Sequence, residues 1–87
     1  MKLHSIDQIV KKDIPLQYRN EYSAVGDIEL SQGEKSRIPI VFSVEMEPSG
    51  NLKINVKVLE RISYPLLPVI RALKEEIKQL QHEGKLL

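Results

Sequence analysis

Apolar and polar residues alternate most regularly between residues 38 and 58. Even-numbered positions are apolar from 38 to 46 and again from 52 to 58, while the odd-numbered positions between them are mostly polar or charged. Because successive side chains of a strand point to opposite faces, this period of two predicts two strands that share one apolar face. The intervening Pro48-Ser49-Gly50 predicts a three-residue hairpin loop with Gly50 in the left-handed conformation.

The apolar face also fixes the register of this hairpin, because paired residues must share a face. The loop places Glu47 opposite Asn51 and Glu45 opposite Lys53. An exposed ion pair contributes tenths of a kcal/mol and an apolar cross-strand pair up to about 1 kcal/mol, so the apolar pairs decide the register. The expected apolar pairs are Met46–Leu52, Val44–Ile54, Phe42–Val56 and Ile40–Val58.

The N-terminal segment predicts a short helix. Ser5 and Gln8 form a Ser-x-x-Gln capping box, and Pro15 would end the helix because proline disfavours a helical residue before it. Apolar residues recur between these signals at helical spacing, at Ile6, Ile9 and Val10.

A period of two returns from Tyr22 onward and predicts a further strand before the hairpin. Ile28 and Leu30 alternate there with Asp27 and Glu29. The sequence Ser-Gln-Gly-Glu at residues 31–34 then supplies a turn into the hairpin.

The C-terminal third predicts a helix with a single apolar stripe. Two starts are open: Ser63 caps the helix with Pro65 in its first turn, or the regular helix begins at Pro68. Gly84 is the expected stop. The stripe consists of Leu66, Ile70, Leu73, Ile77 and Leu80.

This stripe has two interpretations. Its spacing suits the seam of a parallel coiled coil, which makes the five residues a candidate interface between two copies of the chain. The favoured interpretation is that the stripe packs on the apolar face of the sheet within one chain, because that face needs a cover. The chain therefore predicts a single small α+β domain over residues 1–87, ordered α-β-β-β-α, with a three-stranded antiparallel meander packed on one face by the C-terminal helix.

Composition narrows the range of functions. The 13 Lys and Arg residues nearly balance the 12 Asp and Glu residues, so the chain lacks the strong charge of a dedicated nucleic-acid or lipid-surface binder. The sequence contains no cysteine, which excludes disulfides, thiol nucleophiles and cysteine-ligated metals. No signal peptide is recognised and the longest apolar run, at residues 64–70, is too short to span a bilayer, so a cytoplasmic location is expected.

No constellation predicts catalysis, a cofactor or a metal ion. His4 and His82 lie near the ends of the chain, and no short motif supplies either with a fixed partner. Nucleotide-binding glycine loops are absent. The paired carboxylates face solvent or point apart, which leaves little means of tuning a general acid: Glu45, Glu47, Glu75 and Glu76.

Residues 56–68 resemble part of a known fold. Val56-Lys57-Val58 followed by Tyr64-Pro65-Leu66-Leu67-Pro68 is similar to the third strand and Tyr-Pro-x-x-Pro turn of the RWD and ubiquitin-conjugating fold, which also runs from a helix through a meander to this turn. The expected fourth strand is missing. Without cysteine, the resemblance implies at most a non-catalytic interaction module. The alternative is that the prolines only shape the entry to the helix.

The sequence thus predicts a non-enzymatic protein–protein interaction module. A small core often gains stability from a second copy, so a homodimer is expected, formed by helix packing or by pairing of edge strands. The alternative function is weak nucleic-acid binding through basic residues on the outer face of the sheet, with Arg37, Lys53 and Lys57 as the candidate contacts. A third possibility is a small enzyme or ligand site that forms only across a dimer interface.

Overall fold

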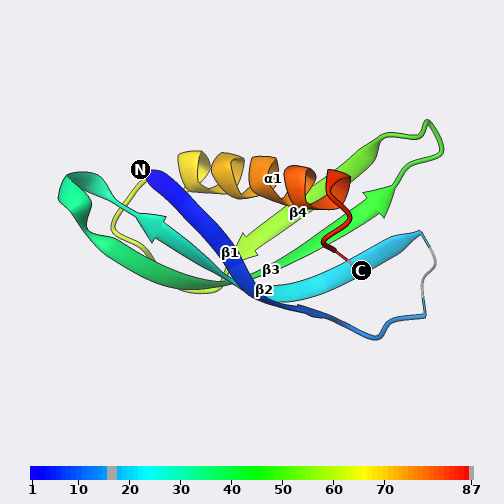
Figure 1. Ribbon diagram of the computed structural model, residues 1–87, viewed down its shortest axis with the longest axis horizontal. Coiled ribbons are helices and arrows are strands. Elements are labelled where there is room, and N and C mark those ends of the chain that lie inside the picture. The colour runs from blue at the N-terminus through cyan, green and yellow to red at the C-terminus, as the bar shows by residue number, and fades with distance from the viewer. Residues whose placement is uncertain (16–17, 87) are drawn as a thin grey trace.

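The computed structural model describes residues 1–15 and 18–86 and has an α+β fold. A four-stranded antiparallel sheet has its strands in chain order, and one helix lies across one of its faces (Figure 1). The elements are β1 (Lys2–Lys11), β2 (Arg19–Glu29), the short 3-10 turn η1 (Ser31–Gly33), β3 (Lys35–Met46), β4 (Leu52–Val58) and α1 (Leu66–His82).

The N-terminal segment is a strand, so the predicted first helix is wrong and the sheet has four strands instead of three. β1 carries one extra residue relative to β2 between Leu3 and Ser5, and another between Asp7 and Val10. Gln8, in the second of these bulges, has a left-handed φ of 51°. Each bulge lengthens the spacing of inward-facing residues from two to three, which imitates a helical pattern.

The hairpin of β3 and β4 has the predicted register. Met46 pairs with Leu52 and Ile40 with Val58, with the two other expected apolar pairs between them. Gly50 has a φ of 90°, and the Glu47 amide donates to the Asn51 carbonyl at 2.8 Å. The alternation of side chains and the loop chemistry were therefore sufficient to define this hairpin.

The core lies between α1 and the facing side of the sheet. The Tyr22 and Phe42 rings stack there with centroids 4.9 Å apart. Gly26 on β2 admits the helix closely, since a Cβ at that position would lie 3.3 Å from Cδ2 of Leu73. The fully buried side chains are Tyr22, Ile28, Ile38, Ile40, Val69, Leu73 and Ile77.

Helix α1 begins at Leu66, with Pro65 as its N-cap residue, which is neither of the two predicted starts. Pro68 is the third helical residue, where a backbone N–H has no acceptor within the helix, so its missing donor costs little. The predicted end is confirmed: Gly84 has a φ of 70°, and the Lys85 amide donates to the Leu80 carbonyl at 3.0 Å. These bonds form the Schellman arrangement that commonly closes a helix.

The order of elements differs from that of the RWD and ubiquitin-conjugating fold. A strand, β1, stands where that fold has its first helix. Tyr64 and Pro65 lead directly into α1, so the Tyr-Pro-x-x-Pro sequence shapes the helix entry in this chain.

Candidate functional site

The two edge strands of the sheet, β1 and β4, differ in regularity. β1 is interrupted by its two bulges, which twist and break the row of backbone groups that a further strand would need. β4 pairs with β3 through Leu52–Val58 without any register shift. Within the described part of the chain, β4 is therefore the regular open edge.

The free backbone groups of β4 belong to its even-numbered residues. Asn51 and Leu59, both odd-numbered, hydrogen-bond to β3 through Glu47 and Pro39, at 2.8 and 3.0 Å. Because bonded and non-bonded pairs alternate in an antiparallel ladder, the intervening even-numbered residues direct their N–H and C=O groups to the open side. Their side chains are apolar and only partly buried on the helix side of the sheet: Leu52, Ile54, Val56 and Val58.

Pro39 lies where β4 ends. Its carbonyl accepts the last hydrogen bond to this side, from Leu59, and its missing N–H faces the position where β4 leaves the sheet. Proline within a strand is tolerated where a neighbouring strand is absent. Pro39 therefore marks the end of the β4 edge.

The outer face of β4 carries two cations without carboxylate partners. Lys53 lies opposite Glu45 as predicted. The Glu45 carboxylate, however, pairs with Arg19 at 3.7 Å, and Arg19 also donates to Glu21 at 3.1 Å. Within residues 1–15 and 18–86, the ion pairs include neither Lys53 nor Lys57. The expected Glu45–Lys53 ion pair is therefore wrong, although the register that suggested it is confirmed.

The charges along the β1 edge are matched within the chain. Arg37 of β3 donates to both carboxylate oxygens of Asp7, at 2.7 and 3.1 Å, and its guanidinium also lies 3.8 Å from Asp27. The hydrogen bonds to Asp7 are the main reason why the pKa of Arg37 is raised. His4 contacts Glu29 at 3.0 Å, and this contact lowers the pKa of the Glu29 carboxyl.

The three candidate nucleic-acid contacts do not converge on one site. Arg37 is engaged by two carboxylates and lies beyond the part of β3 that β4 pairs, which begins at Ile40. Lys53 and Lys57 share the outer face of β4. The structure therefore brings together only these two lysines of the predicted three residues.

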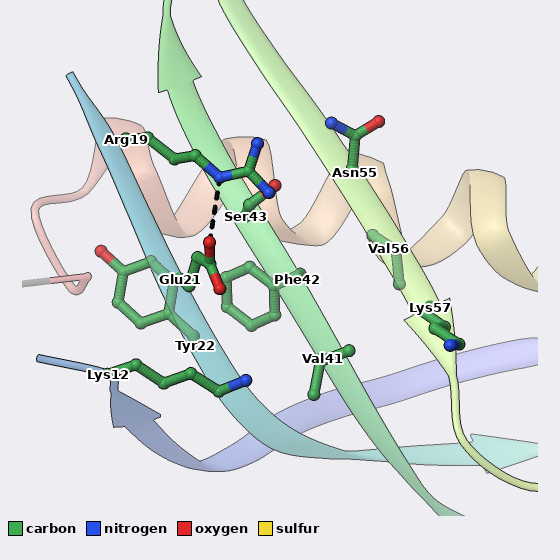
Figure 2. Close-up of a pocket in the computed structure, with 10 residues that line it drawn as sticks. All are labelled: Lys12, Arg19, Glu21, Tyr22, Val41, Phe42, Ser43, Asn55, Val56 and Lys57. Atoms are coloured by element: carbon green, nitrogen blue, oxygen red, sulfur yellow. Dashed lines mark hydrogen bonds and ion pairs between the residues drawn. The ribbon is translucent and has the colours of Figure 1, made fainter. Parts of the chain in front are cut away.

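A small hollow of about 190 Å³ lies on the outer face of the sheet beside β4. Figure 2 shows Ser43 at its centre, with Arg19 on one side and Asn55 of β4 on the other. Ser43 is only 4% exposed, and its hydroxyl has no hydrogen-bond partner among the described residues. No histidine lines the hollow, so Ser43 lacks a base that would make it a nucleophile.

The candidate interface residues of α1 divide into buried and exposed members. Leu73 and Ile77 are fully buried against the sheet of the same chain. Ile70 and Leu80 are half-buried, whereas Leu66 is 51% exposed. The outward side of α1 is largely charged or polar, including Arg71, Lys74, Glu75 and Lys78.

The titratable residues considered at the sequence level do not form a further site. His82 lies in the last turn of α1. In the part of the chain that the structure describes, no three His, Asp or Glu side chains gather closely enough to hold a metal ion. None of the described helices is long and apolar enough to cross a membrane.

The role of Arg19 had no signal in the local residue pattern. Its position depends on the pairing of β2 with β3, which sets Arg19 opposite Glu45. Strand order and register across the sheet are needed to see that one arginine occupies both carboxylates near β4.

Comparison with known proteins identifies a family. Residues 1–82 match the model of the BB_0187 family, and the chain belongs to that family. No curated protein and no solved structure matches the chain.

Proposed function

We propose that this member of the family is a non-enzymatic protein-interaction module that receives an extended segment of another protein on its β4 edge. The observation that carries the proposal is the regular, unpaired edge of Leu52–Val58 beside the bulged edge of β1. An added strand would bond to the free backbone groups of β4, which is a recurrent mode of peptide recognition. A cytoplasmic location remains part of this proposal.

The side chains beside this edge support the same mode of binding. Ile54 and Val56 belong to the even-numbered set whose backbone groups face outward, and both side chains are only partly covered by the chain itself. Apolar residues of an added strand would extend the sheet's apolar face and bury these side chains further. Main-chain bonds would supply affinity, and the alternating side chains would supply selectivity.

A homodimer is the second occupant that this edge could receive. Antiparallel pairing of two copies over the whole of Leu52–Val58 sets Lys53 opposite Lys57 of the second copy, and like charges directly opposite destabilise a sheet. Another protein is therefore favoured over a second copy at this edge. Light scattering distinguishes the two, because a mass of 10.0 kDa at high concentration excludes the dimer and twice that mass supports it.

Weak nucleic-acid binding is supported only by the two lysines of β4 that lack carboxylate partners. This alternative expects affinity for single-stranded nucleic acid that falls steeply with salt and falls further with Lys53→Glu. Binding that is absent or independent of salt excludes it.

Peptide binding by the full chain tests the strand-addition proposal. The probe is a fluorescently labelled heptapeptide of alternating valine and glutamine, which matches the seven residues of β4. Val56→Pro removes one outward N–H without touching the bonds to β3, and we expect it to weaken binding about tenfold. Val56→Thr keeps that N–H and serves as the matched control, with affinity close to that of the wild type.

Amide hydrogen exchange gives an independent measurement on the wild-type protein. In the free protein, the even-numbered amides of β4 exchange fast and the odd-numbered amides exchange slowly. Peptide binding should protect the amides of Leu52, Ile54, Val56 and Val58. Absence of peptide binding, or protection elsewhere than β4, contradicts the proposal.

A further inference from the structure

We infer that the segment received by β4 is acidic, with carboxylates at alternate positions on the outer side of the sheet and apolar residues on the helix side. This inference rests on the proposed function, since it names the chemistry of the partner at the same edge. Its basis is the difference in charge between the two edges of the sheet.

The first step of the argument is the engagement of the nearby carboxylates. Arg19 contacts Glu21 at 3.1 Å and Glu45 at 3.7 Å, so the two acidic residues closest to the middle of β4 on the outer face share one arginine. Lys53 lies directly opposite Glu45 and yet forms no ion pair with it. The positive charge of β4 is left for a group from outside the described chain.

The second step is the surroundings of Asn55, the middle residue on the outer side of β4. The hollow beside it is lined by three cationic side chains and one carboxylate: Lys12, Arg19, Lys57 and Glu21. The buried Ser43 hydroxyl at its centre has no partner among the described residues, and the Asn55 amide at its rim can donate a hydrogen bond. This polar environment has a net positive charge, which complements carboxylates.

The third step is the geometry of an added strand. Neighbouring strands lie about 4.8 Å apart, and diagonal neighbours on one face lie about 7–8 Å apart, within reach of long side chains. A glutamate opposite Asn55 would therefore lie between Lys53 and Lys57. The even-numbered β4 residues would meet apolar residues of the partner on the other face.

The β1 edge lacks each of these features. Asp7 is held by Arg37 and His4 contacts Glu29, so these charges are already matched. Its bulges also interrupt the backbone row. An acidic strand therefore finds complementary charge at β4 and no equivalent among the described residues of β1.

The test compares three labelled heptapeptides on the full chain: valine alternating with glutamate, with glutamine, or with lysine. We expect the glutamate peptide to bind about five- to tenfold more tightly than the glutamine peptide at low salt, and the lysine peptide to bind most weakly. The preference should disappear in the double variant Lys53→Gln/Lys57→Gln and shrink in about 1 M salt, where the screening length is about 3 Å. The matched control is Arg71→Gln/Lys74→Gln, which removes the same charge from the exposed side of α1.

The outcomes separate the two proposals. Equal affinity for the glutamate and glutamine peptides, with both weakened by Val56→Pro, would overturn the acidic partner and leave strand addition standing. A glutamate preference that is lost equally in the α1 control would also overturn it, because the effect would then reflect net charge alone. Failure of every peptide to bind would overturn the proposed function itself.

Discussion

Arg37 of β3 reaches Asp7 of β1 across the full width of β2, with nitrogen-to-oxygen distances of 2.7 and 3.1 Å. The contact joins a central strand to the bulged edge strand on the solvent side of the sheet. Asp27 on the intervening strand adds a second carboxylate at 3.8 Å. The β1 edge is therefore held in place by a charge network as well as by its backbone pairing.

Asp7→Asn should loosen β1 while leaving the rest of the sheet intact. The two-oxygen contact needs a carboxylate, and removing its charge weakens the hold of Arg37 on the edge strand. We expect several-fold faster amide exchange in β1 and no change in β4. The effect should shrink in about 1 M salt, because the pair is exposed and screened. Unchanged exchange in β1 would show that the bulged pairing alone holds this edge.

Glu29 makes stability depend on acid pH. The hydrogen bond to His4 lowers the pKa of the Glu29 carboxyl below its ordinary value of 4.5, desolvation opposes this, and the charges of His4, Lys2 and Lys35 lower it further. A carboxyl whose pKa is lower in the folded state stabilises the fold above its unfolded pKa, and this contribution is lost as pH falls through the folded pKa.

His4→Ala should therefore raise the pKa of Glu29 toward 4.5, measured by NMR titration of its side-chain carboxyl. The difference in melting temperature between the wild type and His4→Ala should be present above pH 4.5 and close at lower pH. An identical Glu29 titration in both proteins would contradict the assigned cause.

Tyr22→Phe should stabilise the protein. The Tyr22 side chain is 1% exposed, and its hydroxyl has no partner in hydrogen-bonding geometry among the described residues. Burial raises the pKa of this phenol by more than the nearby Asn20 side chain lowers it, so the hydroxyl is poorly solvated. Removing such a buried hydroxyl should increase the free energy of unfolding by about 1–2 kcal/mol in urea denaturation. Tyr18→Phe, at an exposed position, is the control and should change nothing.

Gly26 should tolerate only a small side chain. A Cβ there would lie 3.3 Å from Cδ2 of Leu73 and 3.4 Å from Cγ1 of Ile38, so larger groups must push α1 away from the sheet. We expect Gly26→Val to lower the free energy of unfolding by about 1–3 kcal/mol and Gly26→Ala to lower it less. Ser23→Val, on the outer face of the same strand, should be tolerated. Equal stability of both valine variants would contradict close packing at Gly26.

The local pattern was sufficient where each element is regular. β3 and β4 keep a strict period of two, and the loop at Gly50 has the length that their register requires. The end of α1 at Gly84 followed from its need for a left-handed residue. In these places the residue spacing and the backbone geometry carry the same information.

The helix predicted for β1 is wrong because bulges change the spacing on which the prediction depends. Leu3 pairs with Ile28 and Ile6 with Gly26, so a step of three in β1 matches a step of two in β2. A partner strand is needed to reveal the extra residue, and the capping-box pattern at Ser5 then has no helix to cap. The candidate site was hidden for a related reason, because the sharing of Arg19 by two glutamates depends on register across strands.

The amino-acid sequence by itself determined the α+β class, the register of the last hairpin and the apolar stripe of the helix, because these depend on periodicity within short segments. The tertiary structure decided that the chain begins with a fourth strand, that Leu73 and Ile77 face the sheet, and that Lys53 does not pair with Glu45. These features depend on which distant residues meet. Side-chain reach and strand order determine such meetings, and neither is encoded in local spacing.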